Sequence, residues 1–189
     1  VVNGRVKTRG AFPTTPGRTA DGHPVQLLLN IGSAKDVRPE AEGVGLFRTE
    51  FLFLGRRSAP SVAEQRAAYA EVFDLLPGRK VVIRTLDAGS DKPIAFATLE
   101  GEENPALGIR GLRLSIGNPG LMKRQLAGIA AASERTGTET WVMAPMVATV
   151  AEAAEFAAQV REHGLKAGVM VEIPSAALLA PKMLEVVDF

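Results

Sequence analysis

GVGLFRTEFLFLG, from Gly43 to Gly55, is the stretch of sequence that decides the fold. Its apolar run ends abruptly in Arg48 and Glu50 and then resumes. Strands that are buried on both faces read as continuous apolar runs, and in parallel α/β sheets the functional groups gather at the carboxyl ends of the strands. The stretch therefore predicts a buried parallel strand that delivers charge to one edge of a sheet.

Two later stretches repeat this design. KVVIRTLDAGSDK, Lys80 to Lys92, ends its apolar run in Arg84, and AGVMVEIPS, Ala167 to Ser175, ends its run in Glu172. Because the carboxyl ends of parallel strands meet at one edge, we expect Arg84 and Glu172 to share a single site with Arg48.

Strand and helix patterns alternate on both sides of these stretches. Ser61, followed three residues later by Glu64, is typical of a helix N-cap, and Pro174 suits the first turn of another helix. The segment 87–105 is too long for a plain connection, and loops of this length are usually functional or disordered. The last four residues, VVDF, look like the start of a sixth strand. We expect strands over 25–31, 43–47, 81–84, 140–146 and 168–172, and helices over 33–42, 62–76, 106–116, 120–135, 150–163 and 174–185.

This alternation implies right-handed βαβ units, and it leaves two architectures open, a doubly wound sheet and a closed (β/α)8 barrel. A full barrel needs about 250 residues, so five to six units in 189 residues are only part of one. We interpret residues 1–24, with their scattered Gly, Pro and Thr, as a linker or entry segment and 25–189 as the domain. A part-barrel has two unpaired edges, which predicts pairing with a missing segment or with another copy.

The composition narrows the classes of function. A hydrophobic fraction of 46% in 189 residues suffices for one core. Lys and Arg number 22 against 21 Asp and Glu, without a long basic block, which argues against a nucleic-acid partner. Cysteine is absent, so disulfides, thiolate metal sites and a cysteine nucleophile are excluded within this sequence. No apolar run approaches the ~20 residues that span a bilayer, and we expect a cytoplasmic protein with no membrane partner.

The charged strand ends suit an anion. The guanidinium groups of Arg48 and Arg84 are planar forks that bind phosphate or carboxylate through paired hydrogen bonds. Each arginine also has a purely structural interpretation, as an ion pair with a nearby acid. The pairs would be Arg48 with Glu50, and Arg84 with Asp87.

Two further residues are candidates for the same edge. Arg110 lies in ENPALGIRGLR (103–113), where it is either a third anion-binding arginine or part of a solvated basic face. Glu172 lies at a strand tip, where a carboxylate suits Mg²⁺, although a helix cap or an ion pair at the helix start fits equally well. Neither His23 nor His163 has a triad or metal partner in the sequence.

Five motifs in order carry a family resemblance: GVGLFRTEFLF, VVIRTLDAGSDK, ENPALGIRGLR, WVMAPMVATVAEA and GVMVEIPSA. Over roughly residues 21–189 they resemble the phosphoenolpyruvate-binding C-terminal domain of enzyme I of the bacterial sugar phosphotransferase system, a phosphoenolpyruvate-protein phosphotransferase. Because RTEFLF is followed so soon by IRTLDAGSDK, the sequence is more similar to enzyme I than to pyruvate phosphate dikinase or phosphoenolpyruvate synthase, which share the barrel.

The resemblance implies a (β/α)8 TIM-type barrel of which the chain holds the first five to six β/α units. By similarity, Arg48 and Arg84 bind the phosphate of phosphoenolpyruvate, Arg110 lines the same pocket, and Glu172 is one of two acidic Mg²⁺ ligands. The family passes the phosphoryl group to a histidine on a separate domain and on to the phosphocarrier protein HPr for sugar uptake. It also implies a homodimer.

The sequence departs from the family pattern after VDF. The family's second acidic metal ligand, a further arginine and the cysteine thought to protonate the enolate are absent, and so is the phosphohistidine domain. We therefore expect no catalytic residue in this chain and no phosphotransfer by the chain alone. Two alternatives of other classes remain, a dimerisation module without ligand binding and another phosphoenolpyruvate- or pyruvate-using barrel, such as an aldolase-type lyase.

Overall fold

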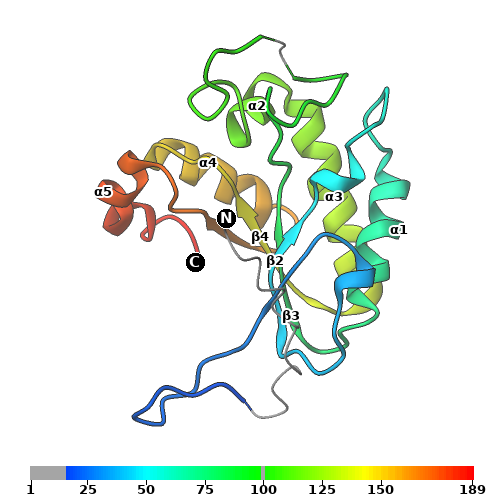
Figure 1. Ribbon diagram of the computed structural model, residues 1–189, viewed down its shortest axis with the longest axis vertical. Helices are drawn as coiled ribbons and strands as arrows, with labels where there is room; N and C mark the ends of the chain where they lie inside the picture. The colour runs from blue at the N-terminus through cyan, green and yellow to red at the C-terminus, as the bar shows by residue number, and fades with distance from the viewer. Residues whose placement is uncertain (1–15, 99–100) are drawn as a thin grey trace, which may run out of the picture.

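One parallel sheet of five strands organises the chain, whose computed structural model describes residues 16–98 and 101–189. The strands lie in the order β1-β2-β3-β4-β5 (Figure 1). Each strand therefore pairs with its neighbours in sequence, without the reversal of order that marks the switch point of a doubly wound sheet. The strands are β1 (Leu29–Ile31), β2 (Gly43–Arg48), β3 (Lys80–Arg84), β4 (Glu139–Ala144) and β5 (Lys166–Val169).

Helices connect the strands and cover the main core. Alternate strand residues such as Val44, Ile83 and Val142 are fully buried and pack with helix residues such as Phe73 and Phe156. None of the helices in the described ranges is both long and apolar enough to cross a bilayer. The helices are α1 (Val62–Phe73), α2 (Leu112–Gly117), α3 (Pro119–Thr136), α4 (Val150–Arg161) and α5 (Pro174–Met183), with 3-10 turns η1 (Ala34–Asp36) and η2 (Glu50–Leu52).

The five expected strands and the cap of the first long helix are confirmed. The Ser61 hydroxyl accepts a hydrogen bond from the Glu64 backbone N–H, and the Glu64 carboxylate accepts one from the Ser61 backbone N–H at 2.8 Å. This reciprocal pair satisfies N–H groups that the first helical turn leaves free.

Three element boundaries differ from the sequence expectation. The first strand begins at Leu29, and the helix expected over 33–42 is only the short turn η1. The helix expected over 106–116 begins at Leu112, because Gly111 has a φ of 58° that an α-helix does not allow. The final residues do run beside β5, since Asp188 N–H donates to the Ala167 carbonyl at 2.7 Å, but they form no regular strand.

The expected entry segment lies partly outside the described residues. Within 16–24, the chain forms a turn in which Arg18 and Pro24 make an isolated antiparallel bridge. The part before residue 16 belongs to the ranges that the structure does not describe.

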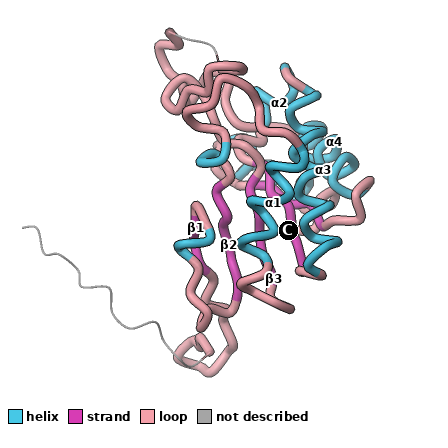
Figure 2. Tube along the Cα trace, turned by 90° about the vertical axis from the view of Figure 1, so that its right-hand side faces the viewer, coloured by secondary structure: helices cyan, strands magenta, loops and turns pink. Residues whose placement is uncertain are grey.

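A second, smaller core covers the carboxyl end of the sheet. Figure 2 shows the long loops gathered beyond one end of the strands. Within the segment after β3, Leu86, Ala88 and Ile94 are buried against Phe53 and Leu121. Part of the long segment that was expected to be functional or disordered is thus packed at the strand ends, whereas residues 91–93 within it are exposed.

Candidate functional site

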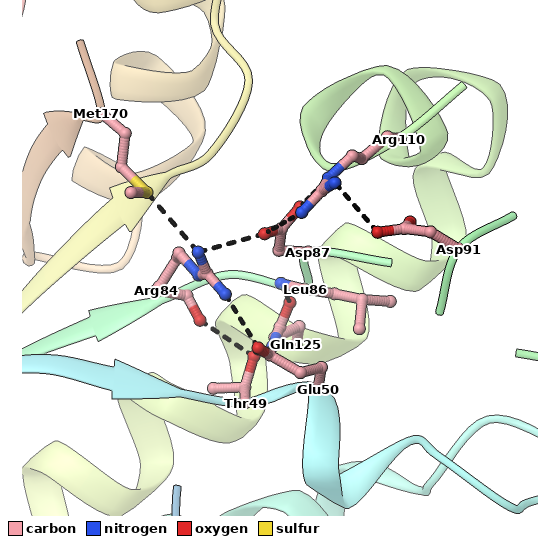
Figure 3. A network of polar contacts seen from close by, with 9 residues as sticks. All are labelled: Thr49, Glu50, Arg84, Leu86, Asp87, Asp91, Arg110, Gln125 and Met170. Atoms are coloured by element: carbon pink, nitrogen blue, oxygen red, sulfur yellow. Dashed lines mark hydrogen bonds and ion pairs between the residues drawn. The ribbon is translucent and has the colours of Figure 1, made fainter. Parts of the chain in front are cut away.

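Arg84 is clamped between two buried carboxylates at the end of β3 (Figure 3). Its Nη2 donates to Glu50 Oε1 at 2.8 Å, and its Nη1 lies 3.0 Å from Asp87 Oδ2. The exposed fraction of the side chain is 8% for Arg84 and 3% for each acid. The expected ion pair between Arg84 and Asp87 is confirmed, and Glu50, which follows β2, is a second partner. The guanidinium orientation is therefore fixed from two sides.

Arg110 reaches the same carboxylate from the long loop. Its Nε donates to Asp87 Oδ1 at 2.9 Å and its Nη2 donates to Asp87 Oδ2 at 3.0 Å, a bidentate arrangement, while Nη1 donates to Asp91 Oδ2 at 3.2 Å. The solvated basic face that was considered for Arg110 is thus wrong. Asp87 holds Arg84 and Arg110 next to each other at the carboxyl edge of the sheet.

The two arginines keep Asp87 ionised. Burial is the largest effect and raises the pKa of Asp87, but the hydrogen bonds from Arg110 and the charges of Arg84 and Arg110 outweigh it, and the pKa lies below its ordinary value. The hydrogen bonds to Asp87 are the main reason that the pKa of Arg110 is raised. At neutral pH Asp87 and Arg110 therefore both carry their charges.

A bulge in β2 sets Arg48 beside Arg84. Val44 pairs with Val81 and Phe47 pairs with Ile83, so a step of three residues on β2 matches a step of two on β3. The extra residue puts Phe47 on the helix-covered face and brings Arg48 into register with Arg84. Partners in register on parallel strands point to the same face, whereas a regular strand counted from Val44 would place Phe47 opposite Arg84.

Arg48 is the least engaged of the three arginines. The considered pair with Glu50 does not form, because Glu50 binds Arg84. Within the described residues Arg48 has no ion pair, its buried Nε has no hydrogen-bond partner, and its guanidinium carbon lies 5.2 Å from the centre of the Phe51 ring. It borders a hollow of about 200 Å³ between the ends of β1 and β2 and helix α1. Within the described structure its guanidinium therefore has fewer polar partners than those of Arg84 and Arg110.

Glu172 lies on the far side of the same edge, just after β5, and its side chain is exposed. Its Oε1 accepts a hydrogen bond at 2.8 Å from the backbone N–H of Met146, a residue after β4 with a φ of 62°. The Glu172 charge is the smallest of the effects that raise the pKa of Arg110, so the carboxylate lies within electrostatic range of that arginine. The helix cap considered for Glu172 is not what the structure shows, since the bond goes to the loop after β4.

The donor type of Glu172 suits Mg²⁺, which takes oxygen ligands and usually keeps water or substrate oxygens in its shell. No group of three or more His, Cys, Asp or Glu residues arranged for a metal ion occurs in the part of the chain that is described. Glu172 by itself can therefore supply one ligand of such an ion.

Sequence reasoning missed Gln125, a buried residue of α3 that reaches the strand ends. Its Oε1 accepts from the Leu86 backbone N–H at 2.9 Å, and its Nε2 donates to Thr49 Oγ1 at 3.0 Å. Its only signal in the sequence is a polar residue within the buried stripe that contains Leu121, Leu126 and Ile129. Sequence reasoning also missed the contact of Met170, whose Sδ lies 3.8 Å from Arg84 Nη1.

The sequence is similar to several phosphoenolpyruvate-protein phosphotransferases and to a multiphosphoryl transfer protein. The chain is 52% identical over 186 residues to the phosphoenolpyruvate-protein phosphotransferase of Streptomyces coelicolor, covering 95% of the chain and 34% of the relative. Identity to the protein of that name from Haloferax volcanii is 43%, over 90% of the chain and 34% of the relative. A multiphosphoryl transfer protein of Rhodobacter capsulatus is 40% identical, over 92% of the chain and 22% of the relative.

The chain thus spans about a third or less of the length of these relatives. The family model that describes the phosphoenolpyruvate-binding domain of phosphoenolpyruvate-utilising enzymes matches residues 6–189. The match covers nearly the whole sequence, including the strand ends that carry Arg48, Arg84 and Glu172. The chain therefore belongs to the family of phosphoenolpyruvate-binding domains of phosphoenolpyruvate-utilising enzymes.

Proposed function

We propose that this chain is the phosphoenolpyruvate-binding part of a phosphoenolpyruvate-protein phosphotransferase. One observation carries the proposal: Arg84 and Arg110, from separate segments, meet through Asp87 at the carboxyl edge of a parallel sheet. In parallel α/β folds that edge is where ligands bind, and paired guanidinium groups suit a phosphate.

Arg48, Arg84 and Arg110 are the proposed substrate-binding residues. Phosphoryl transfer depends mainly on positioning and on cations already oriented toward the charge that develops. Glu50 and Asp87 supply that orientation for Arg84, because they fix its guanidinium before any ligand arrives. Arg48, without an ion pair in the described structure, adds a cation whose donors an anion can take without breaking an existing bond.

Glu172 is the proposed Mg²⁺ ligand contributed by this chain. A bound Mg²⁺ would link the carboxylate to oxygens of the substrate and neutralise part of their charge. The hydrogen bond from the Met146 N–H holds the Glu172 carboxylate toward the strand ends while leaving it exposed.

Several features of the whole protein extend the proposal. The sheet order β1-β2-β3-β4-β5 supports a sector of a (β/α)8 barrel, in which sequential strands are neighbours. The names of the relatives support transfer of the phosphoryl group from phosphoenolpyruvate to a protein. We propose that a histidine of the whole enzyme accepts the group first and that HPr accepts it next, in sugar uptake. We also propose that the whole enzyme is a cytoplasmic homodimer. The chain alone is expected to bind substrate without completing phosphotransfer.

Calorimetric titration of phosphoenolpyruvate with Mg²⁺ tests the proposal. It is run on this chain and on a version extended to the full length of its relatives. Arg48→Ala is the informative variant, because it removes a proposed substrate-binding side chain without breaking an ion pair among the described residues. Arg113→Ala is the matched control: the Arg113 side chain donates to the Gly108 carbonyl and makes no hydrogen bond or ion pair with Arg48, Arg84, Arg110 or Glu172 among the described residues, and its backbone bond to the Arg110 carbonyl is kept in the variant.

We expect binding that Arg48→Ala weakens at least about tenfold and Arg113→Ala leaves unchanged. Molecular mass by light scattering is measured in parallel and should not change. If neither wild-type protein binds phosphoenolpyruvate although both are folded, the proposal fails. An unchanged affinity in Arg48→Ala together with an altered oligomer mass would instead support the dimerisation module.

A further inference from the structure

A buried polar relay runs from helix α1 to the two strand ends that carry Arg48 and Arg84. The relay consists of Gln65, Tyr69, Gln125 and Thr49, and each of them is at most 1% exposed. Burying a polar side chain costs free energy unless its hydrogen bonds are made, and apolar residues would fill a core without that requirement. Four such residues in one chain of contacts therefore call for an explanation beyond packing.

Every step of the relay is a defined hydrogen bond. Gln65 Nε2 donates to the Pro60 carbonyl at 3.0 Å, and its Oε1 accepts from the Tyr69 hydroxyl at 3.0 Å. Burial raises the pKa of Tyr69 well above its ordinary value, so the hydroxyl keeps the proton that it donates. The same hydroxyl accepts from Gln125 Nε2 at 3.2 Å. Gln125 thus has a fixed support on the helix side.

The other side of Gln125 bonds to the backbone after β3 and to the Thr49 side chain after β2 (Figure 3). Its Oε1 accepts from the Leu86 N–H at 2.9 Å, a buried donor that lies beyond the end of the β3 ladder. Its Nε2 donates to Thr49 Oγ1 at 3.0 Å, and Thr49 Oγ1 in turn donates to the Arg84 carbonyl at 2.9 Å. One amide therefore fixes the backbone after β3 and the residue after β2.

The two anchored positions alternate with the charged residues. Leu86 lies between Arg84 and Asp87, and Thr49 lies between Arg48 and Glu50. The separation of these two backbone segments determines whether Glu50 can meet Arg84 at 2.8 Å. A shift of one segment would therefore change the direction of the Arg84 guanidinium.

We infer that Gln125 is a positioning residue for the anion site, acting through Thr49 and Leu86. The inference rests on the proposed function, because it names the group that holds the substrate-binding arginines in place. Among the described residues, the Gln125 side chain itself makes no hydrogen bond to the side chains of the proposed binding residues. At metal sites, removal of the groups that hold the ligands in place typically costs about 10- to 100-fold in affinity or activity, and we expect a loss of the same order here.

Gln125→Met is the test variant, since methionine has a similar shape and lacks the amide. Gln65→Met is the matched control, because Gln65 is buried in the same relay and touches neither strand end. Three quantities are measured for each protein: thermal unfolding, hydrogen exchange of the Leu86 amide by NMR, and phosphoenolpyruvate affinity of the full-length version.

Gln125→Met should lower the affinity at least about tenfold and speed Leu86 exchange by at least a similar factor. Gln65→Met should change both by much less than Gln125→Met at a comparable loss of stability, because the Tyr69 hydroxyl, Thr49 and the Leu86 N–H can still bond to Gln125. If Gln125→Met does not fold, Thr49→Val carries the same expectation for affinity, since it removes only the hydroxyl that links Gln125 to the Arg84 carbonyl.

Unchanged affinity in a folded Gln125→Met protein would overturn the inference, and so would an equal loss in Gln65→Met. The proposed function fails separately, through absence of binding by the wild-type full-length protein. In that case, fast Leu86 exchange in Gln125→Met would show that Gln125 holds the backbone after β3 but that this hydrogen bond has no role in binding phosphoenolpyruvate.

Discussion

Arg110 grips Asp87 with two parallel hydrogen bonds, Nε to Oδ1 at 2.9 Å and Nη2 to Oδ2 at 3.0 Å. The same Oδ2 lies 3.0 Å from Arg84 Nη1. One carboxylate thus offsets the repulsion between two guanidinium groups that would otherwise face each other in a buried setting. The arrangement of these two guanidinium groups therefore depends on this one side chain.

Asp87→Asn should therefore destabilise the fold by about 3 kcal/mol, because it leaves two largely buried cations with one fewer countercharge. Unfolding by urea, with the slope of the transition checked for change, measures the loss. Asp91→Asn is the control, since the Asp91 side chain is 37% exposed and its one ion pair among the described residues is the 3.2 Å contact with Arg110. A loss in Asp91→Asn as large as that in Asp87→Asn would contradict the assignment of Asp87 as the central acid.

The gap in stability between wild type and Asp87→Asn should depend on pH. The pKa of Asp87 is lowered in the folded state, so its contribution is complete above the ordinary aspartate pKa of about 4 and is lost as pH falls through the lower folded value. Asparagine does not titrate in that range. Urea unfolding from pH 7 to pH 3 should show the gap constant at first and narrowing below about pH 4. A gap that widened on acidification would mean the pKa is raised.

Ser61→Ala should cost about 1 kcal/mol, because the serine hydroxyl caps the first turn of α1 and the alanine cannot. For a chain of this size the melting temperature should fall by roughly 2–4 °C. Thermal unfolding measures it, with Ser58→Ala as control, since Ser58 is exposed and has no side-chain hydrogen bond among the described residues. Equal melting temperatures for the two variants would remove the capping argument.

Local rules sufficed to predict much of the fold and part of the site. Continuous apolar runs identified the buried strands, and the charged residues that end them, Arg84 and Glu172, do lie at one edge. The Ser61 and Glu64 spacing identified a helix start because both partners lie within one turn of the chain. Such features depend only on neighbours in sequence, and sequence patterns report those directly.

The remaining features depend on contacts between distant segments. Gln125 bonds to Thr49 across 76 positions of sequence and to Leu86 across 39, and no local pattern connects them. Arg110 was expected in a helix, but its side chain binds Asp87 and the helix starts only after Gly111. The site therefore has to be read from tertiary structure, even where its charged residues are evident in the sequence.

Glu172→Gln should abolish the effect of Mg²⁺ on phosphoenolpyruvate affinity while leaving Mg²⁺-free binding intact. Glutamine can still accept the hydrogen bond that the Met146 N–H donates at 2.8 Å, so the loop stays in place and only the negative charge is lost. In the wild-type full-length protein we expect chelation of Mg²⁺ to weaken binding at least about tenfold, and in Glu172→Gln to change nothing. Titration calorimetry with and without EDTA compares the two proteins.

Glu185→Gln, at an exposed position after α5, should respond to chelation like the wild type. A Glu172→Gln protein that keeps the full Mg²⁺ response would show that the ion is held by other groups, and Glu172 would then be a structural link between the loops after β4 and β5.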